Sequence, residues 1–520
     1  MSKKRLTALV LTLSLLLLSA CELPGASTQP TESETPPVES ETPVQRAEFS
    51  LACDDSDTLD PLATTDSSNL ALAGLVYEGL FELDKNFEPQ PILCESWSSN
   101  STCTVWTFTL RSDVVFSDGT PLTAKRVSSS LKAARSSDLY GERLAQIIGV
   151  STSDNTVTIT LASPNGALPS LLDIPVTLPV EDGIAPLGTG AYYYDTDGGR
   201  LVLRQNPNWR QKQTLPLDCI PLQSVTTADD RIAAFDTGLI TTVTADPTST
   251  NALGYSGSYE TWTCATTNLL YLGFNYASET CQDVVLRQAI SRAIDRGVIA
   301  STLFAGHADP SALPVNPASP LYDTELADEL TFSVSTAAQL LADARYKLTD
   351  NGRLTYRSKP VELTLLVNSE NSFRTATAGY IAEELGKLGI AVTVRELPWE
   401  DFLTALAIGD FDLYLGQVKM TADFDPAVLL TGSLNYGSFL DAETNLLDEQ
   451  ARLLLSAYQT ATGDHRADAA SALHAHLASI LPFTPLCFLR TSVYTQWGAV
   501  SGLQPTQQNP FYHFHSWSID

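Results

Sequence analysis

The sequence has little positive charge. Its 520 residues include 31 lysines and arginines against 60 aspartates and glutamates, so the formal net charge is −29. Nucleic acids and anionic membrane surfaces attract proteins through clustered positive charge. The balance therefore argues against a nucleic-acid partner and against direct attraction to an anionic membrane. It leaves the ligand open, because an acidic surface also serves solubility.

Motifs with known catalytic or metal chemistry are also missing. Residues 254–257 lack the spacing of a nucleophile elbow, and no lysine follows residues 188–190 as it does in a phosphate-binding loop. No two cysteines have the CxxC spacing of a zinc or iron–sulfur site. His513 and His515 would lie on the same side of a predicted C-terminal strand, from which both could bind a metal ion. We favour an ordinary exposed strand without a metal site. We predict no enzyme activity and no cofactor.

Long apolar runs are absent beyond the N-terminus. The first run, Leu6–Leu18, follows three basic residues and is shorter than the roughly 20 residues that a spanning helix needs. A positive start, a short apolar core and small residues before a cleavage point are typical of a secretory signal. Leu-Ser-Ala-Cys at residues 18–21 resembles the bacterial lipobox. That resemblance implies a signal peptide over residues 1–20 and a diacylglycerol on Cys21; an ordinary signal peptide with a chance cysteine is the alternative.

Large apolar side chains are almost absent from residues 22–47, which are dominated by Pro, Ser, Thr and Glu. Such a segment cannot bury enough surface to offset its ordering entropy. We predict a disordered tether over residues 21–47 and a folded part that begins near Glu48. About 470 residues remain, which is more than one ordinary core accommodates, so two or three domains are expected.

Seven cysteines remain once Cys21 is assigned to the lipid, and an odd count leaves at least one thiol unpaired. An exported chain can form disulfides. Cys94 and Cys103 flank a predicted hairpin turn, and Cys264 and Cys281 are also close in sequence. Bridging of these pairs and burial as free thiols are both open.

Strand and helix patterns are mixed along the folded part. Alternating β-rich segments predict strands, and apolar residues at helical spacing predict helices. The predicted strands are Val105–Leu110, Thr156–Leu161, Leu201–Arg204 and Ala391–Val394. The predicted helices are Ala124–Arg135, Val284–Leu303, Thr336–Tyr346, Thr377–Leu388, Glu443–Gln459 and Arg466–Ile480. The later half alternates strand and helix, which indicates an α/β sheet, and the earlier half is richer in strands.

A set of ordered motifs carries a specific resemblance. Residues 95–97, 106–111 and 116–124 read Glu-Ser-Trp, Trp-Thr-Phe-Thr-Leu-Arg and Phe-Ser-Asp-Gly-Thr-Pro-Leu-Thr-Ala. Further motifs follow at Gly188–Tyr192, Asn206–Trp209, Leu286–Arg296 and Gly409–Leu413. From about residue 50 to 490 the pattern resembles the family 5 bacterial extracellular solute-binding proteins, the peptide- and nickel-binding family of ABC importers.

The resemblance implies an α/β, two-lobed fold like that of the type II periplasmic binding proteins, with an extra subdomain in the first lobe. Lobe I is expected over residues 48–268 with the inserted subdomain at about 82–185, lobe II over 269–483, and a return to lobe I over 484–520. The resemblance also implies hinge closure on a ligand, delivery to ABC permease subunits, and an extracytoplasmic location at the membrane through the lipid anchor.

Candidate ligand contacts follow from the same resemblance. Asp423, in Thr-Ala-Asp-Phe-Asp-Pro, matches the aspartate that pairs with a peptide's free amine in relatives; a loop aspartate that caps a turn is the alternative. Trp399 matches an aromatic residue that lines the peptide cleft, with core packing as the alternative. Asn368, Ser369 and Arg374 lie between a predicted strand and a predicted helix, a favoured ligand position in α/β sheets. Turn and cap roles are the alternative for these three.

Two departures separate the chain from oligopeptide-binding relatives. Gln417 follows Gly416 where relatives often have tryptophan, and Lys419 is the only basic residue between Arg395 and Arg452. We predict a substrate-binding lipoprotein of an ABC importer whose ligand is an oligo- or dipeptide. The alternatives are an oligosaccharide, a metal chelate, since nickel and haem binding occur in the wider family, or a sensor or adhesion role.

Overall fold

The computed structural model describes residues 48–181, 183–430 and 448–519. Within it, Ala47–Asp520 form one compact unit. The predicted signal peptide, Cys21 and the tether lie outside the described residues, as does the start of the predicted helix at residues 443–459. None of the helices in the described ranges is both long and apolar enough to cross a membrane.

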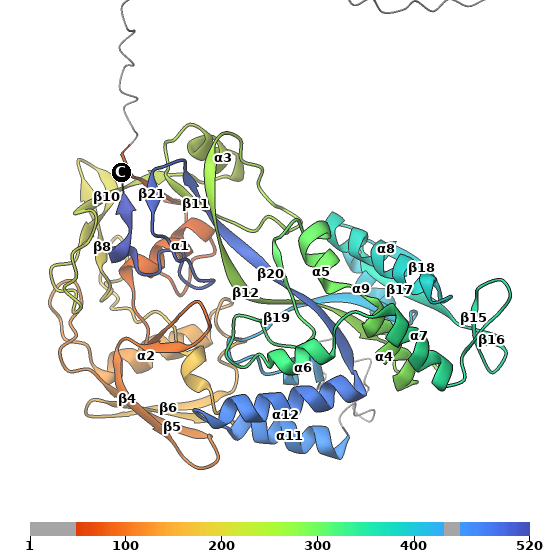
Figure 1. Ribbon diagram of the computed structural model, residues 1–520. Coiled ribbons are helices and arrows are strands. Elements are labelled where there is room, and N and C mark those ends of the chain that lie inside the picture. Colours follow the sequence, from red (N-terminus) through yellow and green to blue (C-terminus); the bar gives the residue numbers. More distant parts are fainter. Residues whose placement is uncertain (1–47, 182, 431–447, 520) are drawn as a thin grey trace, which may run out of the picture. The chain divides into compact units, whose positions relative to one another are not determined.

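A mixed sheet of seven strands lies at the centre of the compact unit (Figure 1). Its order is β11-β20-β12-β19-β17-β18, and β13 also pairs with β20. The strands are β11 (Thr242–Ala245), β12 (Tyr259–Phe274), β13 (Ala308–Pro310), β17 (Glu362–Asn368), β18 (Ala391–Leu397), β19 (Leu413–Lys419) and β20 (Phe483–Gln496). The long strands β12 and β20 pair antiparallel along their length, whereas β17 runs parallel to β18 and β19.

Helices bury this sheet on both faces. Leu270, Leu272 and Phe274 of β12 enter one hydrophobic core, and Leu269 and Tyr271 enter another. Side chains of a strand alternate between faces, so one apolar run supplies both cores. The first core contains α4 (Val284–Ala293), α7 (Val334–Asp343) and α8 (Ser372–Lys387), and the second contains α9 (Trp399–Ile408), α11 (Glu449–Thr460) and α12 (His465–Ile480).

One predicted helix is wrong. The segment 284–303 is broken, because Ile294 is extended and the Asp295 side chain caps a new start at α5 (Arg296–Val298). A short π-helix follows at Ile299–Leu303. Aspartate competes for backbone N–H groups in this way, which ends one helix and begins another.

Two smaller sheets form the N-terminal part. One has the order β1-β10-β9-β8 and the other β4-β5-β7-β6. Their strands are β1 (Leu51–Cys53), β10 (Cys219–Ser224), β9 (Arg200–Gln205), β8 (Tyr192–Asp197), β4 (Cys94–Ser99), β5 (Val105–Leu110), β7 (Thr156–Leu161) and β6 (Ile147–Ser153). The second sheet and α2 (Ala124–Arg135) share one core, and we call residues 81–178 around it the outer module. The predicted bounds of β5, β7 and α2 are confirmed.

The C-terminal residues pack against the first of these sheets. Val493, Phe511 and Trp517 share a core with Phe49 and Leu51. The predicted strand at 513–515 is wrong, since residue 513 is left-handed and a 3-10 turn follows at Phe514–Ser516. No cluster of three metal-ligating side chains occurs within the described ranges. The bounds predicted for the two lobes stay a prediction.

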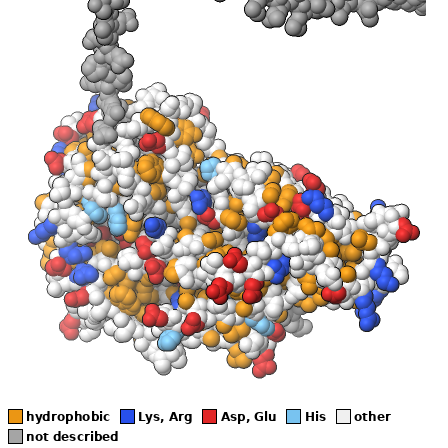
Figure 2. All heavy atoms as spheres, in the orientation of Figure 1, with side chains coloured by type: hydrophobic (Ala, Val, Ile, Leu, Met, Phe, Trp, Pro, Cys, Tyr) orange, Lys and Arg blue, Asp and Glu red, His pale blue; other side chains and the backbone are white. Residues whose placement is uncertain are grey.

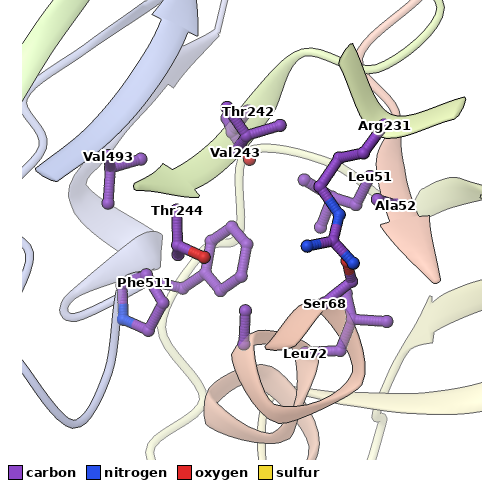
Figure 3. Close-up of a pocket in the computed structure, with 12 residues that line it drawn as sticks. Leu51, Ala52, Ser68, Leu72, Arg231, Thr242, Val243, Thr244, Val493 and Phe511 are labelled. Carbon is purple, nitrogen blue, oxygen red and sulfur yellow. The ribbon is translucent and has the colours of Figure 1, made fainter. Parts of the chain in front are cut away.

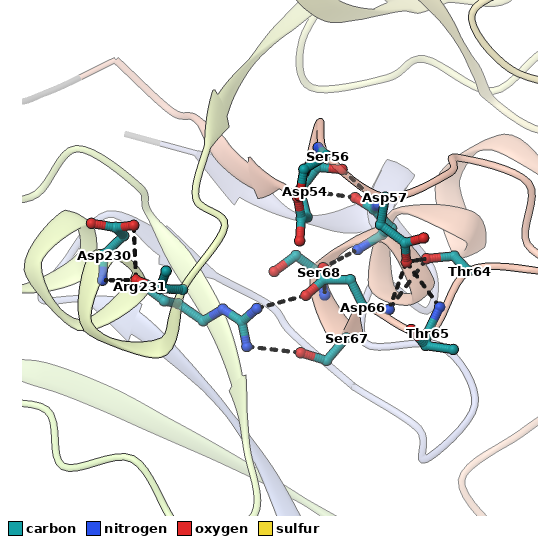
Figure 4. Close-up of polar contacts among 12 residues, drawn as sticks. Asp54, Ser56, Asp57, Thr64, Thr65, Asp66, Ser67, Ser68, Asp230 and Arg231 are labelled. Atoms are coloured by element: carbon teal, nitrogen blue, oxygen red, sulfur yellow. Dashed lines mark hydrogen bonds and ion pairs between the residues drawn. The ribbon is translucent and has the colours of Figure 1, made fainter.

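An ion pair fastens two distant helices in this region (Figure 4). Asp66 caps α1 (Ser67–Val76) by accepting from the N–H groups of Ser68 and Asn69 at 2.7 and 3.0 Å. Arg231 of α3 (Ala228–Asp236) donates to Asp66 Oδ2 at 2.8 Å, and both side chains are largely buried. The same carboxylate therefore stabilises the start of α1 and holds α3 against it.

The cysteines are free thiols in the part of the chain that the structure describes. Cys94 and Cys103 are both buried but not bridged, and neither are Cys264 and Cys281. Burial raises the pKa of the Cys94 thiol to about 11. These thiols therefore behave as small apolar side chains.

Candidate ligand-binding site

Asp423 lies in the turn between β19 and α10 (Ala427–Leu430), with 4% of its surface exposed. Its Oδ2 atom accepts from Asn165 Nδ2 at 2.9 Å, and its Oδ1 atom accepts from the Thr421 hydroxyl. Asn165 belongs to the outer module and precedes Asp423 by 258 residues. The carboxylate is thus buried where two parts of the fold meet, and the donors to its oxygens among the described residues are all neutral.

Helices α11 and α12 contact this turn through hydrogen bonds. Arg466 Nη2 donates to the Asp423 carbonyl at 2.6 Å, and the Tyr458 hydroxyl donates to the same oxygen. Asp425 accepts from Gln459 Nε2 at 2.8 Å. Burial, and then the charge of Asp423, raise the pKa of Asp425. Two carboxylates that disfavour each other's charge make this turn a favourable place for a cation.

The outer module contacts both this turn and the C-terminal end of α11. Gly166 N donates to Gln459 O at 2.6 Å, and Cys103 Sγ donates to Thr460 O at 3.3 Å. Phe87 packs edge-on against Phe424 with ring centroids 5.1 Å apart. We call these contacts, together with the Asn165–Asp423 hydrogen bond, the Asp423 junction.

Positive charge lies on β19, the strand that leads to the turn with Asp423. Lys419 ends β19 with an exposed side chain, yet its pKa is lowered because surrounding protein displaces water and because Arg143 repels its charge. Arg143 pairs with Asp173 at 2.9 Å, and its Nε and Nη2 atoms are buried with no hydrogen-bond partner in the described residues. Lys419 is four residues before Asp423, so their Cα atoms lie within about 14 Å of each other.

The other predicted ligand residues gather where β17 and β18 end. Arg374, in the first turn of α8, donates from Nη2 to Gln417 Oε1 of β19 at 2.7 Å, and burial lowers its pKa. Asn368 is 3% exposed and accepts from the Glu370 N–H at 3.3 Å. Ser369 is exposed, and its N–H donates to the carbonyl of residue 397 at 2.8 Å. Arg374 therefore meets the strand that leads to Asp423.

Trp399 begins α9, and 38% of its surface is exposed. Its ring stacks on Phe402 with centroids 5.8 Å apart, and its backbone N–H donates to Glu370 Oε1 at 3.1 Å. An exposed indole supported by a buried ring is accessible to a ligand. It is also consistent with the packing role that the sequence left as the alternative.

Sequence reasoning missed Asn165, Arg143 and Arg466. No local pattern marks them, because each reaches this site through contacts with residues far along the chain. The single sequence signal for these residues was the shortage of basic residues near Lys419, which left a ligand carboxylate with few local partners. The structure supplies a further cation from the outer module.

The described cavities lie away from these residues. A pocket between β1, α1, β11 and Phe511 (Figure 3) has a volume of about 20 Å³, room for about one water molecule. A larger cavity of about 390 Å³ lies between helices α4, α6 (Thr324–Glu329), α7 and α12. Another of about 460 Å³ lies beside α2. None of the three is lined by Asp423, Trp399 or Arg374. Over the visible face, acidic and basic side chains are mixed (Figure 2).

Comparison with known proteins gives a family and a fold. The family model described as "Bacterial extracellular solute-binding proteins, family 5 Middle" matches residues 88–438. The glutathione-binding protein GsiB of Salmonella typhi is 27% identical over 306 residues, which cover 56% of this chain and 59% of GsiB. The oligopeptide-binding protein AppA of Bacillus subtilis is 24% identical over 482 residues, which cover 86% of this chain and 88% of AppA.

Among solved structures, the nickel ABC transporter protein of Bacillus halodurans matches with a TM-score of 0.70 at 21% identity, covering 89% of this chain and 97% of that one. The mixed α/β fold is thus that of the type II periplasmic binding proteins, as the sequence resemblance implied. Because the family model covers well over half of its length, this chain belongs to the bacterial extracellular solute-binding proteins of family 5.

Proposed function

We propose that this chain is the substrate-binding lipoprotein of an ABC importer and that it captures a short peptide through the peptide's free amine at Asp423. The buried carboxylate of Asp423 carries the proposal, because within the described ranges its oxygens receive neutral donors alone and Asp425 lies beside it. A ligand ammonium would replace the amide of Asn165 with a charge-assisted hydrogen bond. Membership of the family and the two relatives named for glutathione and oligopeptides support the same ligand class.

The positive charge near Asp423 suits the other end of a free peptide. The Lys419 side chain has no hydrogen bond or ion pair in the part of the chain described, and Arg143 adds a second cation close to it. A zwitterion with its amine at Asp423 and its carboxylate at Lys419 would satisfy both charges. The two Cα atoms are at most about 14 Å apart, and this upper limit favours a peptide of a few residues. Trp399, Asn368, Ser369 and Arg374 would contact its side chains.

The proposal includes the anchor and the two lobes. Cys21 would carry the lipid, and the tether over residues 21–47 would hold the protein outside the cytoplasm near the permease. Lobe I would comprise residues 48–268 and 484–520, and lobe II residues 269–483, with hinge closure trapping the ligand. Replacing Cys21 with alanine should release the exported protein from the membrane fraction; membrane retention of Cys21→Ala would contradict the lipid anchor.

Calorimetric titration with trialanine and N-acetyl-trialanine tests the amine contact. We expect Asp423→Asn to weaken trialanine binding roughly 10- to 100-fold, the range for a charged hydrogen bond. The acetylated peptide should bind the native protein weakly and be insensitive to the change. Asp401→Asn, an exposed aspartate in α9, is the matched control. Equal trialanine affinity in Asp423→Asn and native protein would refute the amine contact.

A second pair of peptides tests the carboxylate contact. Lys419→Gln should weaken trialanine by about tenfold and leave trialanine amide unchanged, since only the free acid meets the cation. Lys359→Gln on an exposed strand end is the control. If no peptide binds the native protein and a sugar oligomer or a nickel–histidine chelate does, the peptide ligand itself is wrong.

A further inference from the structure

A second cavity lies between helices that belong to the two cores of the central sheet, away from the residues proposed to bind peptide. Its volume is about 390 Å³, within the range of small-molecule sites. Helices α4, α6, α7 and α12 and the start of β20 form its walls, and these helices lie close together in Figure 1. None of the residues proposed to bind peptide lines it.

Two arginines line this cavity without a carboxylate partner. Arg296 is 8% exposed and donates to Pro485 O at 2.8 Å, Ser291 O at 3.3 Å and Ser291 Oγ at 2.9 Å. All three acceptors are neutral, and a guanidinium has five N–H groups, so two of them have no acceptor among the described residues. Arg292 donates to Thr331 O at 3.1 Å. Neither arginine forms an ion pair within the described ranges.

A buried cation without a counter-ion is costly, and Arg296 is buried whereas Arg292 is only partly so. Burial lowers the pKa of Arg296 to about 10, and Arg292 adds repulsion. Burial also lowers the pKa of Arg292, which the exposed Glu329 partly offsets. An anion in the cavity would relieve both arginines at once.

The rest of the wall is mostly apolar. Its larger apolar members include Leu313, Leu326, Leu330, Leu340, Leu477, Leu481 and Phe483, and the exposed Glu329 is the one carboxylate among the lining residues. His474 also lines the cavity; it is 1% exposed, and both ring nitrogens have no hydrogen-bond partner in the described residues. The wall therefore combines a positive end with apolar surface and an unsatisfied polar ring.

We propose that this cavity is a second ligand site, which binds a small organic anion with an apolar body, its acidic group at Arg292 and Arg296. The site is separate from the Asp423 junction and does not depend on the peptide ligand. The acidic group neutralises the paired guanidinium charges, and the apolar body covers the leucines of α6 and α7.

Octanoate and 1-octanol are the probes, because they share an alkyl chain and differ in charge. In calorimetric titration of the native protein at pH 7, octanoate should bind at least tenfold more tightly than octanol. Arg292→Gln should weaken octanoate roughly tenfold, as expected for loss of a charged hydrogen bond, and leave octanol unchanged. Arg345→Gln, an exposed arginine outside the cavity, should behave like the native protein.

Filling the cavity provides an independent test. Leu340→Trp should abolish octanoate binding, whereas the same change at Leu348, which is 63% exposed, should not affect it. Absence of octanoate binding to the native protein, equal affinity for octanol, or unchanged octanoate affinity in Arg292→Gln would each overturn the proposal. Unchanged octanoate affinity in a folded Leu340→Trp would overturn it as well. Arg292→Gln keeps the test decisive if Leu340→Trp fails to fold.

Discussion

Replacing Gly166 with alanine should separate the outer module from α11. A Cβ atom at this position would lie 2.0 Å from the carbonyl oxygen and 2.8 Å from the carbonyl carbon of Ala461. Both obstacles are backbone atoms, so no side chain can swing aside. Restoring ordinary contact requires a movement of more than 1 Å at the point where Gly166 N now donates to Gln459 O.

The expected loss of stability follows from the bonds that this movement strains. One is the backbone hydrogen bond of Gly166, and the other is the bond from Asn165 to the Asp423 carboxylate. A neutral hydrogen bond contributes about 0.5–1.5 kcal/mol and one to a charged group about 1.5–3 kcal/mol, so we expect a loss of about 2–4 kcal/mol. Gly166 does not have a left-handed backbone, so the effect is steric rather than conformational.

Urea unfolding followed by circular dichroism measures the change, with α8 as the control. Gly379 and Gly386 lie in that helix with no atom within 4 Å of an added Cβ. Alanine at either should be neutral or stabilise the protein by about 0.5–1 kcal/mol. A Gly166→Ala protein as stable as the native one, with unchanged peptide affinity, would refute the role given to the Asp423 junction.

Other changes test the electrostatics of the fold. Arg231→Ala should cost about 1–3 kcal/mol in urea unfolding, because it leaves the largely buried Asp66 carboxylate without its cation. Arg204→Ala breaks a more exposed pair and should cost clearly less; equal losses would contradict this. Burial raises the pKa of Glu82 to about 7, so the folded protein holds this proton more tightly than the unfolded chain, and stability should fall by up to about 3 kcal/mol as pH rises from 4.5 through 7. Glu82→Gln should remove that loss, and unchanged pH dependence would speak against it. Burial lowers the pKa of His474 to about 4, so in a Glu82→Gln background stability should rise between pH 4 and 6.5; a flat profile there would contradict the burial of an uncharged imidazole.

Local sequence patterns were sufficient to predict an element's bounds where the apolar periodicity and the capping residue indicate the same bounds. The strands Val105–Leu110 and Thr156–Leu161 alternate cleanly, and Thr123 caps α2 by accepting from the N–H of Arg126 at 3.3 Å. Where a polar side chain competes for the backbone, periodicity misplaces the boundary. Asn371 starts α8 at Ser372 rather than at Thr377, because its side chain accepts from the N–H of residue 374.

The same limit applies to the candidate site: residues in a contiguous motif could be predicted from the sequence, and partners from distant segments could not. The motif around Asp423 is contiguous, so its resemblance to peptide-binding relatives could be recognised from the sequence. The partners of Asp423 could not, because Asn165 and Arg466 reach it only after the outer module and α12 have packed. Nothing in the residues around Arg143 indicates that it lies near Lys419.

Those distant partners give the turn its electrostatic character. Asp423 and Asp425 both lie within it, and the charge of Asp423 raises the pKa of Asp425. Arg466 is the cation at this turn, yet it donates to the backbone carbonyl of Asp423 rather than to either carboxylate. With both aspartates ionised the turn therefore carries one more negative charge than positive. An arriving ammonium would remove that excess, lower the pKa of Asp425 toward its ordinary value and release Asn165, so ligand binding and rearrangement of the Asp423 junction would be coupled.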